Sequence, residues 1–138
     1  MKLIFSFFFL SFLGFLDNTY LTIEHYKNAI PPCTIAHGCE TVLTSRFSTI
    51  SGIPISILGI LFYLFSIGLV VLYLDTKRTL FLQFLLILTS ISLIVSLVLV
   101  GIQAFVLHAF CQYCLTSEGI NIVLFVLSVS WLKRVKQI

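Results

Sequence analysis

The sequence contains few charged residues for its length. Lys and Arg together number eight and Asp and Glu five among 138 residues, so charged residues make up 9% of the chain. Soluble domains average about 25% charged residues, and this shortage excludes a soluble domain. The hydrophobic share of 59% instead indicates an integral membrane protein. The net charge of +3 does not indicate a nucleic-acid partner, because the basic residues lie at the ends of apolar segments.

The apolar residues form four long runs, at residues 3–23, 54–74, 79–107 and 115–132. A helix needs about 20 apolar residues to cross the ~30 Å hydrocarbon core of a bilayer. We therefore predict an all-α membrane protein, a four-transmembrane-helix bundle that forms a single domain over residues 1–138. The first run resembles a signal peptide, but no A-x-A-like cleavage site follows it, so we expect it to stay in the protein.

Basic residues are distributed unequally between the two ends of this bundle. Cytoplasmic loops of membrane proteins collect Lys and Arg. Only Lys27 and Arg46 fall on one side, and six basic residues fall on the other: Lys2, Lys77, Arg78, Lys133, Arg134 and Lys136. We expect the side with six, which includes both termini, to be cytoplasmic and the loop of residues 24–53 to lie outside. All four cysteines then lie at the outer face: Cys33, Cys39, Cys111 and Cys114.

The outer loop, residues 24–53, carries a helical pattern of its own. Leu43, Phe47 and Ile50 recur at i, i+4 and i+7, with Ser and Thr on the opposite face. This periodicity predicts a short amphipathic cap helix that lies over the mouth of the bundle.

Four cysteines at an oxidising face favour disulfides, and two interpretations stay open. Two static bridges could tie down the outer loop. Alternatively, the C-x-x-C pair of Cys111 and Cys114 exchanges disulfides, because a bridge across two residues closes too small a loop to stabilise the protein much. No metal is expected, because a zinc site of four thiolates does not suit an oxidising face. Haem attachment is excluded because Leu115, and not a histidine, follows Cys114.

The C-x-x-C pair lies where one predicted span ends and the next begins. A thiol at this boundary can meet both an aqueous protein and a molecule dissolved in the membrane. A disulfide that oxidises other proteins repeatedly must pass the electrons on, and quinone is the abundant two-electron acceptor in membranes. The position therefore predicts electron transfer from thiols to quinone.

Four motifs occur in order along the chain: GFLDNTYLTIEHY, C-x5-C-E-T-V-L-T-S, GIPISILGILFY and CQYCLTSE. Together they resemble the bacterial branch of the vitamin K epoxide reductase family over about residues 14–126. The resemblance implies a four-helix bundle around a quinone, either ubiquinone or menaquinone, in the bacterial inner membrane. It also implies a thiol:quinone oxidoreductase that reoxidises a periplasmic thioredoxin-fold protein and so supports disulfide bond formation.

The resemblance implies roles for individual residues. Cys111 and Cys114 would form the quinone-side disulfide, with Cys114 nearest the quinone. Cys33 and Cys39 would shuttle electrons from the thiol partner to Cys111. Ser45 matches the family's loop serine or threonine near the active site. Because the chain ends soon after its fourth span, we expect the thioredoxin-fold partner to be a separate protein.

Two positions depart from the pattern of the vertebrate family members. Ile55 stands where those members carry an asparagine that binds the vitamin K carbonyl, and Glu118 stands where they carry a tyrosine. Both differences favour the bacterial role. Reduction of vitamin K quinone or its epoxide stays open as the alternative activity.

Polar residues within or beside the predicted spans are candidates for the site, because polar groups are costly in lipid. Glu118 and Asn121 follow Cys114 by four and seven residues and so share its helix face. We expect a neutral Glu118 that donates a proton or hydrogen bond to the quinone; the alternative is a carboxylate that reaches water at the interface. Gln103, two turns before Cys111, would bond between helices or to a quinone oxygen.

Two further polar groups have roles that the sequence leaves open. Asp17 shares a helix face with Tyr20 and Glu24, where it would either relay protons or join helices. His108, one turn before Cys111, would either stabilise the thiolate of that cysteine or face water.

Two rival functions would leave different signatures from thiol oxidation. A structural four-span protein with two static disulfides would show no quinone-dependent turnover. A transmembrane conduit for thiol reductant needs cysteines that are accessible from both sides, whereas all four cysteines here are predicted on one side.

Overall fold

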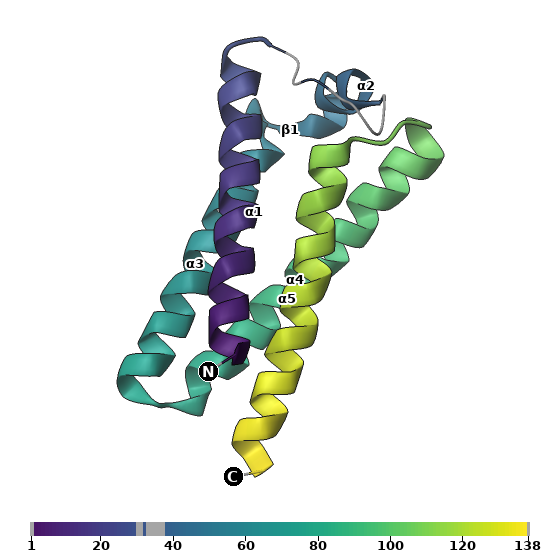
Figure 1. Cartoon of the computed structure of the whole chain (residues 1–138). Coiled ribbons are helices and arrows are strands. Elements are labelled where there is room, and N and C mark those ends of the chain that lie inside the picture. The colour runs from purple at the N-terminus through teal and green to yellow at the C-terminus, as the bar shows by residue number, and fades with distance from the viewer. Residues whose placement is uncertain (1, 30–31, 33–37, 138) are drawn as a thin grey trace.

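Four long helices make up the protein. The computed structural model describes residues 2–29, 32 and 38–137. The helices are α1 (Lys2–Tyr26), α3 (Ile55–Thr76), α4 (Thr79–Gly101) and α5 (Gln112–Gln137), and they run alternately up and down the bundle (Figure 1). Each span is long and apolar enough to cross a membrane. The predicted all-α four-span bundle is therefore confirmed, and the chain is a multi-pass membrane protein.

The last two spans differ from the predicted ones at their ends. Helix α5 runs from Gln112 to Gln137 rather than over 115–132, and the added residues include the polar ones Gln112, Lys133, Arg134, Lys136 and Gln137. The third run is not one regular helix: α4 ends at Gly101 and continues as the π-helix η2 (Ile102–Val106). Single-turn π-helices inside helices are frequent at functional sites.

The second half of the loop between α1 and α3 is built differently from the predicted cap helix. Helix α2 (Cys39–Leu43) is followed by the 3-10 helix η1 (Arg46–Ser48). Ser45, with an extended backbone, separates them. The side chains of Thr44 and Ser45 donate to the carbonyls of Glu40 and Val42, and such local bonds compete with helix continuation. The single helix expected through Leu43, Phe47 and Ile50 is therefore not formed.

A short β-hairpin with a two-residue turn completes the loop. Strands β1 (Thr49–Ile50) and β2 (Ile53–Pro54) pair antiparallel. Ser51 and Gly52 connect them with φ values of 53° and 83°. Positive φ at both central residues is what a tight hairpin turn demands. We call residues 38–54 the cap, because they lie over one end of the bundle (Figure 1).

Most of the apolar core lies in the half of the bundle away from the cap. Its buried residues come from all four helices: Phe7, Tyr63, Val70, Leu82, Leu85, Ile120, Leu124, Trp131 and Leu132. The Trp131 ring packs edge-on against Phe7 from α1 and Tyr73 from α3, with centroids 6.5 and 5.2 Å apart. Aromatic pairs in this arrangement add to the stabilisation from burial. This half of the bundle therefore anchors the helices whose other ends carry the polar residues.

Helices α1 and α3 approach closely at two glycines. A Cβ atom at Gly14 would overlap the ring of Tyr63, and a Cβ at Gly59 would overlap the side chain of Asn18. Small residues at such positions let the backbones of transmembrane helices come together. The two glycines thus fix where Tyr63 and Asn18 lie in the bundle.

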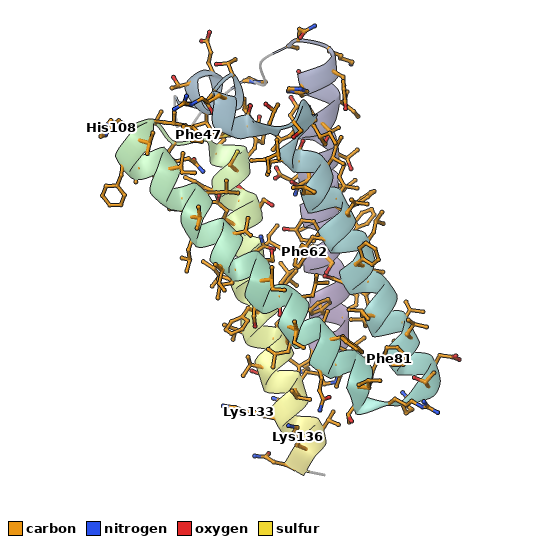
Figure 2. The ribbon with its side chains drawn as sticks, turned by 180° about the vertical axis from the view of Figure 1, so that it is seen from behind. Phe47, Phe62, Phe81, His108, Lys133 and Lys136 are labelled. Atoms are coloured by element: carbon orange, nitrogen blue, oxygen red, sulfur yellow. The ribbon has the colours of Figure 1, made fainter. Side chains whose placement is uncertain are left out.

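The two ends of the bundle differ in chemistry. Both chain termini lie at the end opposite the cap (Figure 1), and Figure 2 shows Lys133 and Lys136 there, with Phe47 and His108 at the cap end. The Lys77–Arg78 turn between α3 and α4 lies at the same end as the termini. Basic side chains therefore gather away from the cysteines.

Gly14→Ala should destabilise the protein, because the added methyl group displaces the buried Tyr63 ring. Overpacking of this kind costs about 1–3 kcal/mol. Gly68→Ala is the matched control, since it lies in the interior of α3 and its Cβ would meet nothing within 4 Å. Thermal unfolding in detergent should show a lower midpoint for Gly14→Ala alone. An unchanged midpoint in Gly14→Ala would contradict the close approach of α1 and α3.

Candidate functional site

The two cysteines of the C-x-x-C pair lie at the start of α5. Both are free thiols, Cys111 fully buried and Cys114 half-buried. Cys111 precedes the helix, and its carbonyl accepts the N–H of Leu115 at 2.9 Å. The side chain of Cys114 projects from the first turn of α5. The pair is thus held at the junction of a loop and a membrane-spanning helix.

A large cavity lies under the cap. Its volume is about 810 Å³, and residues from all four long helices and from the cap line it. The sulfur-bearing side chain that lines it is that of Cys114. Ligand pockets typically measure about 300–1,000 Å³ and are mostly apolar with a few polar groups. The cavity meets this description, since apolar residues of α3 and α4 supply much of its wall.

Cys111 packs on the cap side of the pair. It forms a buried cluster with Cys39 and Val42 of α2, and the exposed fractions of Cys111 and Cys39 are 0% and 1%. Cys39 is disulfide-bonded. Cys33, the expected partner of Cys39, lies outside the described residues. The structure therefore brings three of the four predicted catalytic cysteines to one region, because Cys39 and Cys111 share a buried cluster and Cys114 packs against it.

The cap is tied directly to the loop that carries Cys111. The N–H of Gly38 donates to the carbonyl of Phe110 at 3.1 Å. A Cβ at Gly38 would lie 2.6 Å from the backbone nitrogen of Phe110, so only glycine permits this approach. The hydroxyl of Tyr113 donates to the carbonyl of Pro32 at 2.7 Å. These contacts hold α2 against the C-x-x-C pair.

Hydrogen bonding within the pair changes the acidity of Cys111. The Cys114 side chain donates a hydrogen bond that lowers the pKa of Cys111 to about 7, against the opposing effect of burial. A hydrogen bond to the charged form of a group favours that form. Cys111 is therefore the thiol of the pair that is more easily ionised, and the thiolate is the reactive species in disulfide exchange.

One wall of the cavity carries the polar residues that the sequence predicts. Gln103, Glu118 and Asn121 all line the cavity, and their side chains are 3%, 6% and 9% exposed. The amide of Asn121 donates to the hydroxyl of Ser96 at 2.8 Å. Glu118 Oε2 and Asn121 Oδ1 are buried without a hydrogen-bond partner among the described residues. Such atoms point to a ligand, because buried polar groups are normally satisfied.

A second polar group was not predicted. Asn18 donates to the Ser117 hydroxyl at 3.0 Å, and the Tyr63 hydroxyl lies 3.2 Å from the same oxygen. All three residues line the cavity and come from α1, α5 and α3. Asn18 lies next to Asp17 in an apolar run. Because polar groups are costly in lipid, its presence there could have marked it as a candidate site residue. That these residues of three helices meet at one place could be seen only from the fold.

The remaining candidate residues lie around this site. Ser45 lines the cavity, and its hydroxyl donates to the carbonyl of Val42. Asp17 is half-buried, and its Oδ2 has no partner among the described residues. Tyr20 is 37% exposed and its ring packs on Tyr113, with centroids 5.6 Å apart. His108 is exposed and has a φ of 50°, and its exposure is expected of a residue that faces water.

Comparison with family models identifies the family of this chain. The model of the vitamin K epoxide reductase family matches residues 5–129, which is most of the chain. A search of curated proteins returned no match. Among the described residues, no group of three or more His, Cys, Asp or Glu side chains could hold a metal ion.

The acidity of Cys111 can be measured from the ultraviolet absorbance of its thiolate. We expect reduced Cys33→Ser/Cys39→Ser protein to show an ionisation midpoint near pH 7. Cys114→Ala in that background removes the donor, so the midpoint should rise to about 8.5 or above. Thr116→Ala, an exposed change on the same helix, should leave it unchanged. An identical midpoint with and without Cys114 would contradict the hydrogen bond.

Proposed function

Because the chain belongs to the vitamin K epoxide reductase family, we propose that this membrane oxidoreductase oxidises protein thiols and passes their electrons to a quinone. The observation that carries the proposal is the arrangement of the cysteines. Cys114 lines a large cavity among the membrane-spanning helices, whereas Cys111 packs against the disulfide-bonded Cys39 in the cap. A structural protein with static disulfides requires no such cavity beside a thiol.

The proposed reaction has two stages: thiol exchange with the partner at Cys33 and Cys39, and oxidation of the inner pair Cys111 and Cys114 by quinone. A transfer of two electrons between the two pairs joins these stages. A thioredoxin-fold partner first gives two electrons and two protons to the Cys33–Cys39 disulfide by thiol–disulfide exchange. The reduced pair then reduces the Cys111–Cys114 disulfide, and the close packing of Cys39 on Cys111 supports this step. Finally the Cys111–Cys114 dithiol closes its S–S bond, and two electrons and two protons convert the quinone to the quinol. The net result is one new disulfide in the partner.

The residues around the cavity fit a quinone. A flat apolar ring suits the apolar wall from α3 and α4, and a ring carbonyl needs a hydrogen-bond donor. Glu118 as a neutral acid supplies such a donor from its unpartnered Oε2. Asn121 lies one turn further along α5 and has its own unpartnered oxygen, which suits the hydroxyl of the quinol product. The proposed acceptor is ubiquinone or menaquinone, which differ in the ring that the cavity would hold.

We also propose an orientation in the bacterial inner membrane. The basic residues gather at the end of the bundle with both termini, and cytoplasmic ends of membrane proteins are rich in Lys and Arg. The cap and the cysteines would then face the periplasm, where a separate thioredoxin-fold protein can reach Cys33 and Cys39. Ile55 lines the cavity without offering a hydrogen bond, which favours this bacterial role over vitamin K epoxide reduction.

Cysteine variants should separate the two stages. We expect Cys111→Ala and Cys114→Ala to abolish quinol formation with any thiol donor, because the second stage is lost. Cys33→Ala and Cys39→Ala should block the reaction with a reduced thioredoxin-fold protein. They should still leave turnover with dithiothreitol, a small thiol that reaches the inner pair. Quinone absorbance follows each reaction.

A trapping experiment provides the internal control for these variants. With Cys114→Ala, a mixed disulfide between Cys39 and Cys111 should accumulate and be identified by mass spectrometry. Equal and complete loss of dithiothreitol-driven turnover in all four single variants would argue against two stages.

A further inference from the structure

We propose that Gln103 is a positioning residue that fixes which oxygen of the Glu118 carboxyl group carries the proton. It thereby aims an O–H group into the cavity. The placement of the proton stands on the geometry alone, and its use in reduction rests on the proposed function. Gln103 lies in the π-helix η2 and is 3% exposed. Its side chain bonds on one side to the loop before α5 and on the other to α5 itself.

The orientation of the Gln103 amide is determined by its neighbour. Side-chain Oε1 accepts the backbone N–H of Cys111 at 3.0 Å. A backbone N–H can only donate, so the atom that faces it must be the oxygen of the amide. The amide nitrogen Nε2 must then face Glu118, where it donates to Oε1 at 3.4 Å. The backbone carbonyl of Gln103 also accepts the N–H of Ala109 at 3.0 Å, which fixes the loop further.

The bond from Gln103 determines the role of each Glu118 oxygen. Because Nε2 donates to it, Oε1 acts as an acceptor and cannot at once point a proton toward Gln103. Glu118 is 6% exposed, and no ion pair to it occurs within the described part of the chain. A carboxyl group buried without a cationic partner is stable as the neutral acid. The proton therefore resides on Oε2, the oxygen that is buried and has no hydrogen-bond partner among the residues that the structure describes.

This arrangement matters for reduction of an acceptor that takes up protons on oxygen. The O–H at Oε2 donates a hydrogen bond to the acceptor oxygen and then transfers its proton, which leaves a carboxylate. In the proposed reaction, one of the two protons released by the Cys111–Cys114 dithiol then restores the acid. The Gln103 N–H groups stabilise that carboxylate, because hydrogen bonds to charged groups are the stronger ones. Without Gln103 the acid proton could reside on either oxygen, and part of the population would present no donor to the cavity.

The infrared carbonyl stretch of neutral Glu118 tests the placement without any substrate. Glu118→Gln identifies the band by its loss. Gln103→Met keeps the length of the side chain but removes the hydrogen bond to the Glu118 carbonyl oxygen, so the band should move to higher frequency. Gln83→Leu, at an exposed position of α4, is the control and should leave the band unchanged. An unshifted band in Gln103→Met, or no Glu118 band in the native protein, would overturn the proposal.

Turnover in a double-mutant cycle distinguishes positioning from a structural role. We expect Gln103→Met to lower kcat about 10-fold with little change in KM, the loss expected for one hydrogen bond to a charged group. In the Glu118→Gln background the same change should lower kcat by less than about 2-fold. A full loss in both backgrounds would overturn the proposal, and Gln103→Leu repeats both measurements if Gln103→Met does not fold. Absence of quinone reduction in the native protein would instead refute the proposed function, while the infrared result would still stand.

Discussion

The burial of polar side chains in a bundle with almost no charge is the constraint on which this structure depends. Lipid offers no hydrogen bonds, so each polar group among the helices needs a partner in the protein or in a cavity. The bundle separates apolar packing from polar burial along its length. An apolar core around Trp131 and Phe7 fills the half near the termini. The half under the cap holds the polar residues around a cavity of about 810 Å³.

That separation also organises the thiols. Cys111 and Cys114 are three residues apart, yet one packs against the cap and the other lines the cavity. The loop before α5 produces this difference, because Gln103 and Gly38 hold its backbone from two sides. A pair of sulfurs at such a boundary can exchange with a disulfide in the cap and still face the membrane-side cavity. The proposed electron path therefore needs no large movement of the helices.

Much of the fold follows from the sequence, because apolar run length and charge determine how many helices cross a membrane. The C-x-x-C pair and the carboxyl group of Glu118 could be found from spacing along one helix. Other features depend on contacts between distant segments. The hydroxyl bonds of Thr44 and Ser45 break the expected cap helix. The group formed by Asn18, Tyr63 and Ser117 joins three helices, and no local pattern predicts that they meet.

The most direct test of thiol-to-quinone transfer is a single turnover without oxygen. Reduced Cys33→Ser/Cys39→Ser protein is mixed with one equivalent of a short-chain ubiquinone or menaquinone analogue, and its remaining thiols are then alkylated under denaturing conditions and counted by mass spectrometry. The account predicts one quinol formed for each Cys111–Cys114 disulfide that appears. Two free thiols and an unchanged quinone, with both analogues in folded protein, would contradict it.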